Sequence, residues 1–220
     1  MPDDIILILA DGEWRGAARL PGLATCAGRV LAADGAWAKA TANGIPVDAV
    51  IGDLDSLTSK EREALLDADV DVHGYAPDKD LTDLELAVDI ALAGQARRLI
   101  VFGAFGGRID HTLANVLMLE KAVARGVAVE LIVGEETAWL IRDRFTLPIG
   151  RPGDRVSLIP LSDEAVVRTE GLAYPLDDET LARASAHGVS NVIETMPVRI
   201  ALRSGTLLVV HGPAEGGDRA

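Results

Sequence analysis

Residues 98–116, RLIVFGAFGGRIDHTLANV, combine an apolar run, a glycine-rich turn and the start of a helix. The apolar run predicts a strand over Arg98–Gly103, and glycines 106 and 107 break the pattern before Arg108 and Asp110. Apolar residues then recur at helical spacing, which predicts a helix over about Ile109–Ala124 that Gly126 ends. A buried strand that turns directly into a helix is typical of a parallel α/β sheet.

The same alternation extends over the first 135 residues. The clearest of the other helices is Asp83–Ala93, where Thr82 can cap the first turn and the Glu85 side chain can reach back in a capping box. We therefore predict an α/β domain, residues 1–135, with a mostly parallel, Rossmann-like sheet flanked by helices. The other predicted strands are Ile5–Ala10, Arg29–Ala33, Ala49–Ile51, Val70–Gly74 and Ala128–Val133.

After Gly134 the pattern changes to short β-rich segments separated by Gly, Pro and Asp. This pattern predicts a second domain, residues 136–220, built as an all-β sandwich or barrel. One helix is predicted within it, over Asp178–Ala186. The predicted strands are Ala138–Arg142, Arg155–Pro160, Ala165–Thr169, Val198–Leu202 and Thr206–His211.

Composition excludes several classes of protein. A formal net charge of −13 argues against a protein that binds nucleic-acid backbones, because such a protein needs a basic face. No stretch approaches the ~18 consecutive apolar residues of a membrane helix, and the N-terminus has no basic, long-apolar signal pattern. The single cysteine, Cys26, excludes an intrachain disulfide and is predicted to be a small buried hydrophobic residue. These features predict a cytoplasmic protein.

Polar clusters follow four of the predicted strands. Asp34-Gly35 follows the second, Gly52-Asp53-Leu54-Asp55-Ser56 the third, Asp78–Asp83 the fourth and Gly103–His111 the fifth. The carboxyl ends of parallel strands share one edge of a sheet, and ligands bind at that edge. The sequence therefore predicts that all four clusters line one rim.

The residue types at this rim favour a metal ion held against a polyphosphate. Asp53 and Asp55, two residues apart on an extended segment, project to the same side and repel each other unless a cation lies between them. Asp83 at a helix start is a third candidate ligand for Mg²⁺, which prefers carboxylate, phosphate and water oxygens. The backbone at Gly106–Gly107, with Arg108 and Lys79, is suited to bind phosphate.

Each of these motifs alone has an ordinary structural reading. An Asp-x-Asp after a strand is more often turn chemistry than a metal site, and Thr82 is first a helix cap. Asp110 can simply favour the helix dipole, and His111 in a first turn is more often a packing or capping residue than a base. The order of the clusters at successive strand ends is what favours the functional reading. No P-loop, dinucleotide-binding glycine turn, nucleophile elbow or zinc spacing occurs in the chain.

This ordered set resembles the thiamine pyrophosphokinase family. The matching motifs are Asp34-Gly35, Gly52–Ser56, Asp78–Glu85 and Gly106–His111, followed by Gly171–Leu176 and Ser190-Asn191. The resemblance spans residues ~30 to ~195. It implies an enzyme that uses Mg²⁺ to transfer the pyrophosphoryl group of ATP to thiamine, giving AMP and thiamine diphosphate. It also implies a homodimer whose active sites lie between subunits.

The resemblance extends to candidate site residues. Ser190, Asn191 and Tyr174 are implied to contact thiamine. Two departures from the family pattern are Ala36, where many members have glycine, and the lack of any aromatic residue after Tyr174; Met196, Tyr174 or Trp139 is left to contact the thiamine ring. The candidates for catalysis are Asp53, Asp55, Asp83 and Arg108, the first three as metal ligands. The candidates for ATP binding are Asp34, Lys79, Asp80, Thr82, Gly106, Gly107, Arg108, Asp110 and His111.

Three alternative functions are also compatible with these motifs. A pyrophosphokinase of the same fold could act on a hydroxymethylpterin, because the acidic motifs do not read the acceptor. A dehalogenase-type phosphatase also has Asp-x-Asp after a strand, but normally after the first strand rather than the third. A non-enzymatic nucleotide or thiamine sensor would not need a second phosphate-binding loop such as Gly106–Arg108.

Overall fold

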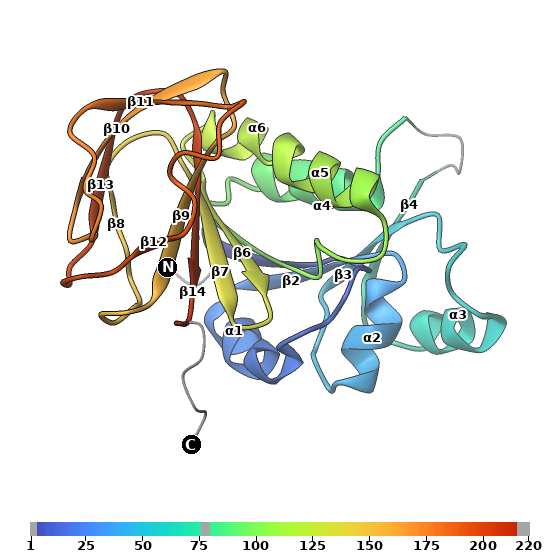
Figure 1. Cartoon of the computed structure of the whole chain (residues 1–220). Helices are drawn as coiled ribbons and strands as arrows, with labels where there is room; N and C mark the ends of the chain where they lie inside the picture. Colours follow the sequence, from blue (N-terminus) through green and yellow to red (C-terminus); the bar gives the residue numbers. More distant parts are fainter. Residues whose placement is uncertain (1–3, 76–79, 215–220) are drawn as a thin grey trace. The chain divides into compact units, whose positions relative to one another are not determined.

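The computed structural model describes residues 4–75 and 80–214. Its contacts divide the chain into two compact units, Met1–Gly134 and Glu135–Ala220. Figure 1 shows helices in the first unit and almost only strands in the second. Within the described residues, no helix is long and apolar enough to cross a membrane.

The first unit is a parallel sheet in the spatial order β6-β5-β1-β2-β3-β4. All of its strand pairs are parallel, and the interior strands are buried along nearly their whole length, which requires cover on both faces. The strands are β1 (Ile5–Leu9), β2 (Arg29–Ala33), β3 (Ala49–Gly52), β4 (Asp71–Gly74), β5 (Arg98–Phe102) and β6 (Ala128–Val133).

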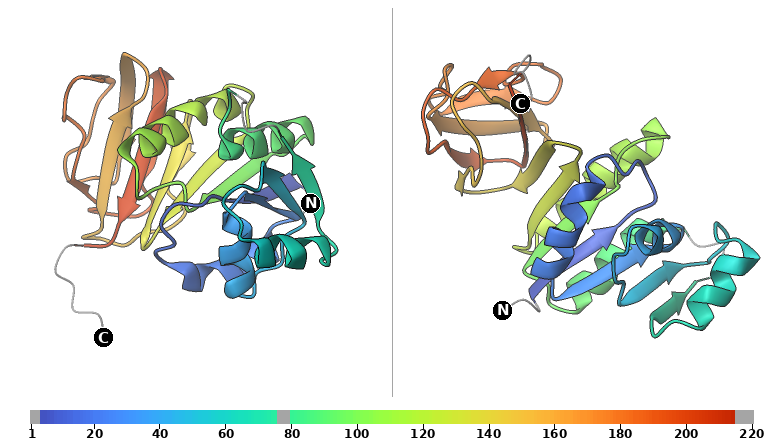
Figure 2. Two further views of the ribbon diagram at one scale, coloured as in Figure 1. Left: turned by 90° about the vertical axis from the view of Figure 1, so that its right-hand side faces the viewer. Right: turned by 90° about the horizontal axis from the view of Figure 1, so that it is seen from below.

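Helices cover both faces of this sheet. α4, α5 and α6 lie on one face and α1, α2 and α3 on the other (Figure 1), and the view from below in Figure 2 looks onto the second group. Their bounds are α1 (Leu20–Cys26), α2 (Ala36–Ala42), α3 (Ser59–Leu66), α4 (Asp83–Ala93), α5 (Ile109–Met118) and α6 (Glu120–Val123), with a 3₁₀ turn at Ala17–Arg19. The single helix predicted over Ile109–Ala124 is thus divided at Leu119, and Cys26 is exposed rather than buried.

β1 is where the direction of winding changes. It pairs with β2 on one side and with β5 on the other, so the chain builds the sheet outward in one direction and then crosses back over β1. In such sheets a crevice opens beyond the carboxyl ends of the strands at this switch point. The loops after β1 and β5 therefore flank the expected ligand position.

The second unit contains two antiparallel sheets, ordered β12-β9-β14-β7 and β11-β10-β13-β8. Alternate residues of β10 and β13 point into one apolar core, as expected for a half-buried strand. The strands are β7 (Glu136–Ile141), β8 (Phe145–Thr146), β9 (Arg155–Pro160), β10 (Glu164–Glu170), β11 (Glu179–Ala182), β12 (Asn191–Val192), β13 (Arg199–Ser204) and β14 (Leu207–Gly212). The prediction of an α/β unit followed by an antiparallel β unit is confirmed.

The helix predicted over Asp178–Ala186 is wrong. Glu179–Ala182 forms β11, which pairs with β10 and buries Leu181 in the core. Asp178 has φ 53°, a left-handed conformation in which a right-handed helix cannot begin. Its carboxylate is held by Arg168 and Arg203, which come from two neighbouring strands.

Candidate active site

The loops after β1 and β5 are joined by backbone hydrogen bonds. The N–H of Gly12 donates to the carbonyl of Gly103 at 2.9 Å, and that of Glu13 donates to Phe105 at 2.7 Å. A Cβ at position 12 would lie 2.3 Å from the Gly103 oxygen and 2.4 Å from the Phe105 oxygen. Only glycine allows this approach, so the pairing of the two loops depends on Gly12.

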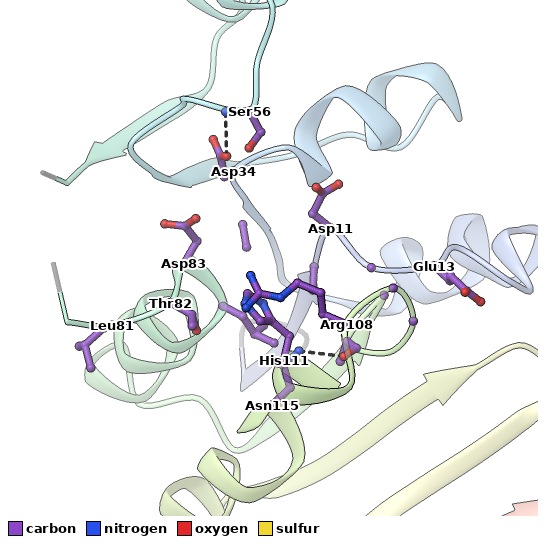
Figure 3. Close-up of a pocket in the computed structure, with 18 residues that line it drawn as sticks. Asp11, Glu13, Asp34, Ser56, Leu81, Thr82, Asp83, Arg108, His111 and Asn115 are labelled. Carbon is purple, nitrogen blue, oxygen red and sulfur yellow. Dashed lines mark hydrogen bonds between the residues drawn. The ribbon is translucent and has the colours of Figure 1, made fainter. Parts of the chain in front are cut away.

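A cavity of about 650 Å³ opens over these loops. In Figure 3, Asp11, Asp34 and Asp83 lie on one side of it and His111 and Asn115 on the other, with Arg108 between them. The described residues that line it come from the ends of β1, β2, β3 and β5 and the loops after them, from the start of α4 and from α5. They are Ala10, Asp11, Gly12, Glu13, Ala33, Asp34, Ser56, Leu81, Thr82, Asp83, Leu84, Gly103, Ala104, Gly106, Gly107, Arg108, His111 and Asn115.

Asp34 is the most buried acid of this site, with a relative exposure of 5%. Its Oδ2 accepts a hydrogen bond from the Ser56 N–H at 3.3 Å, as drawn in Figure 3. Its Oδ1 is buried without a hydrogen-bond partner. Burial, followed by the nearby charge of Asp83, raises the pKa of Asp34 to about 6. A buried carboxylate oxygen without a partner is costly, which points to a missing positive group.

Two further aspartates place their carboxylates close to that of Asp34. Carboxylate oxygens of Asp34, Asp53 and Asp55 all lie within 4.8 Å of one another. Asp83 lies beside this group, because a Cβ at Gly52 would be 3.0 Å from its Oδ1 and 2.9 Å from the Asp34 Cβ. Glycine at position 52 therefore lets the two acids approach. The oxygen-only donors and the unpartnered Asp34 oxygen fit a hard divalent cation.

The glycine loop, Gly103–Arg108 after β5, also contributes residues to the lining of the cavity. Gly106 packs against Glu13, whereas a Cβ at Gly107 would meet no atom within 4 Å, so this part of the backbone is open to a ligand. Arg108 begins the segment leading into α5 and donates to both carboxylate oxygens of Asp110, with Nε to Oδ1 at 3.1 Å. The paired guanidinium lowers the pKa of Asp110. Asp110 thus orients Arg108 but does not itself line the cavity.

The start of α4 is also part of the site. Thr82 Oγ1 accepts from the Glu85 N–H at 3.2 Å, so the predicted cap is confirmed. The Glu85 carboxylate accepts instead from Lys121 at 3.1 Å. Asp80 is exposed and does not line the cavity, and the predicted phosphate ligand Lys79 lies outside the described residues.

Three polar side chains of this cavity were not predicted from the sequence. Asp11 and Glu13 follow β1, and Asn115 on α5 donates a buried hydrogen bond to the Ala104 carbonyl at 2.8 Å. Asp11 and Glu13 obey the same strand-end rule that identified the other clusters, so the signal was present. Asn115 carries no such signal, because its role depends on which face of α5 is buried.

The three residues implied to contact thiamine lie together in the second unit. The buried Asn191 amide accepts from the backbone N–H of Tyr174 and Val192 and donates to the Tyr174 carbonyl at 2.7 Å. These bonds hold a backbone segment from which the Tyr174 side chain projects, 71% exposed. Ser190 is exposed, has φ 60°, and donates its N–H to Ser157. Trp139 packs against Phe145 in the core and is not available to stack on a ligand.

Comparison with known proteins identifies the family. Residues 21–131 match the model of the thiamin pyrophosphokinase catalytic domain, and residues 145–207 match that of the thiamin pyrophosphokinase vitamin B1 binding domain. The chain belongs to the thiamin pyrophosphokinase family. Family membership confirms the prediction of an enzyme, a thiamine diphosphokinase.

Individual members of this family agree in sequence and in fold. Thiamine pyrophosphokinase from Bacillus subtilis is 32% identical over 169 residues, covering 76% of this chain and 78% of that protein. A crystal structure of thiamine pyrophosphokinase from the same species superposes with a TM-score of 0.83 at 25% identity, covering 96% and 99% of the two chains. The thiamin pyrophosphokinase structure from Geobacillus thermodenitrificans gives 0.81 at 28% identity, with the same coverage.

Proposed function

We propose that this protein transfers the pyrophosphoryl group of ATP to the hydroxyl of thiamine, with Mg²⁺, and releases AMP and thiamine diphosphate. The observation that carries the proposal is the grouping of Asp53 and Asp55 with Asp34, which lines the same cavity as Asp83 and the glycine loop, although Asp53 and Asp55 do not line it themselves. Carboxylates and phosphate donors around one cavity suit a magnesium polyphosphate. The family match adds thiamine as the acceptor.

In this proposal Asp53, Asp55 and Asp83, predicted from the sequence, hold the metal together with Asp34. Bound Mg²⁺ would neutralise charge on the phosphates as the leaving group departs. The chain's own groups position the substrates: the N–H groups of Gly106–Gly107 and the guanidinium of Arg108 bind phosphate oxygens, and Asp110 keeps Arg108 in place. One of the aspartates accepts the proton of the attacking hydroxyl. Positioning and charge neutralisation supply most of the acceleration in such transfers.

For thiamine we propose Tyr174, Ser190 and Asn191. The amide of Asn191 is largely used by backbone groups, so its contribution is to hold Tyr174 in place. We further propose a cytoplasmic homodimer with active sites shared between subunits. An apolar stripe on α5 supports this proposal, because Ile109, Leu113 and Leu117 follow one another at one-turn spacing and are 79%, 59% and 50% exposed.

Phosphorus NMR tests the reaction directly. The protein is incubated with Mg²⁺ and ATP, and with either thiamine or a hydroxymethylpterin as acceptor. The proposal expects AMP and thiamine diphosphate to appear together, only with thiamine and only with the metal. Release of ADP or free phosphate would contradict pyrophosphoryl transfer, and product from the pterin alone would contradict the acceptor.

A further inference from the structure

Lys39 on α2 makes three polar contacts to the loop that follows β1. Its Nζ donates to the carbonyl of Asp11 at 2.7 Å and to that of Gly12 at 3.0 Å. The same Nζ lies 2.8 Å from Asp11 Oδ1. Lysine has three donors on its ammonium group, so these contacts account for all of them.

The loop that Lys39 holds lies between Gly35, at the start of α2, and the loop after β5. Toward α2, a Cβ at Gly35 would be 3.0 Å from the Cγ and Oδ2 atoms of Asp11. Toward β5, Gly12 and Glu13 bond to the glycine loop. The segment Asp11–Glu13, two residues of which are labelled in Figure 3, thus connects the loop of Asp34 and Gly35 to the loop that would receive phosphate.

We propose that Lys39 is a positioning residue that holds Asp11–Glu13 in the shape that binds the nucleotide. This inference rests on the proposed function in one respect, because it takes ATP as the ligand of the cavity. Lys39 does not line the cavity, and the proposal includes no contact between Lys39 and the substrate. It acts through the backbone of Asp11 and Gly12.

The partial exposure of the Lys39 side chain determines whether its contacts affect the stability of the whole fold or the affinity for the nucleotide. The Lys39 and Asp11 side chains are roughly half-exposed, at 41% and 49%, and an exposed ion pair contributes little to global stability. Two carbonyls held by one ammonium nevertheless restrict the loop. When the binding-competent loop is only fractionally populated, the apparent affinity for the ligand falls by that fraction. We therefore expect a change in nucleotide affinity with little change in unfolding temperature.

The kinetic test uses Lys39→Met, Lys39→Arg and the control Lys60→Met, which removes an exposed charge from α3. If the competent loop falls to about one molecule in ten, the KM for ATP rises about tenfold in Lys39→Met. We expect kcat and the KM for thiamine to stay near wild type. Lys39→Arg, which keeps the charge and several donors, regains part of the affinity, and Lys60→Met changes none of these constants. A fall in kcat with unchanged KM for ATP would overturn the proposal.

Hydrogen exchange in the nucleotide-free protein gives a readout that is independent of the reaction. The amides of Gly12 and Glu13 are bonded across to the β5 loop, and in Lys39→Met we expect them to exchange at least several-fold faster while the amides of β1 and β5 do not change. Unchanged exchange overturns the proposal and assigns any loss of affinity to direct contact between Lys39 and the ligand. If wild-type protein fails to convert thiamine but the loop still opens in Lys39→Met, the reaction is wrong and the positioning role stands.

Discussion

At the scale of single residues, the charged form of the Asp34 carboxyl is unfavourable in the folded protein. Its pKa is raised to about 6, with burial as the largest cause and Asp83 next. A carboxyl whose pKa is higher in the folded state binds its proton more tightly there than in the unfolded chain. Folding therefore becomes less favourable as pH rises from about 4 to about 6, and the penalty is fully present above that range.

Replacing Asp34 by Asn removes this penalty while an amide oxygen remains to accept from Ser56. We expect metal-free Asp34→Asn to unfold at a higher temperature than wild type at pH 8, and the difference to disappear near pH 4. Thermal unfolding at both pH values, in EDTA, measures this. The exposed Asp69→Asn serves as a matched control and should shift neither value. A lower unfolding temperature for Asp34→Asn at pH 8 would mean that the charge of Asp34 is satisfied within the chain.

Asp55 is the exposed member of the same group. We expect Asp55→Asn to lower turnover by about a hundredfold or more, since loss of a metal ligand removes about 3 kcal/mol of transition-state stabilisation. The fold should persist, because Asp55 contributes no buried packing. Initial rates with saturating ATP and thiamine, with circular dichroism as a check on folding, test this. Near-normal kcat in the variant would remove Asp55 from the metal site.

At the scale of elements, the first turn of α4 joins helix stability to the site. Thr82 caps the helix, and the next residue, Asp83, is a proposed metal ligand. Thr82→Ala should cost about 1 kcal/mol of stability and lower the unfolding temperature by about 2–4 °C. It should also raise the KM for ATP, because the turn that carries Asp83 loosens.

Thr58 provides the comparison for this prediction. It caps α3 in a complete capping box with Glu61, and it does not line the cavity. Thr58→Ala should therefore lower the unfolding temperature by a similar amount without changing the KM for ATP. Equal changes in KM for the two variants would show that general destabilisation, rather than the position of Asp83, is responsible.

The helices and strands also differ in how well they could be predicted from the sequence. The strands of the first unit other than β4 were predictable because buried parallel strands are mainly apolar runs, such as Leu99–Phe102, whereas β4 is an exposed edge strand with the sequence DVHG. The misassigned helix at Asp178–Ala186 was not recoverable in this way, because Asp178 is fixed by Arg203, 25 residues away. The grouping of Asp34 with Asp53 and Asp55 likewise depends on β2 lying beside β3, a tertiary pairing that no local pattern encodes. The residue types identify the acids in the sequence, and the order of the strands in the sheet brings their side chains close to one another.

At the scale of the whole molecule, each unit has its own apolar core and its own family match. Every described residue of the proposed metal and phosphate site belongs to the first unit, although the net charge of −13 belongs to the whole chain. The clustered carboxylates repel one another when no cation is present. The free energy of unfolding of the first unit should therefore depend on whether a cation is bound at these carboxylates, and the net charge of the whole chain does not predict this dependence.

Mg²⁺ and ATP together should raise the unfolding temperature, because they bind only the folded state. At a hundred times the dissociation constant the gain is about 2.7 kcal/mol, which corresponds to a shift on the order of 5–10 °C for a chain of this size. ATP in EDTA should give little of this shift, since the phosphates would then face unneutralised aspartates. Asp55→Asn should lose most of it, and Asp69→Asn should keep it. Differential scanning calorimetry measures all four conditions. An equal shift by ATP without the metal would place the nucleotide away from the aspartates and contradict the proposed arrangement of the site.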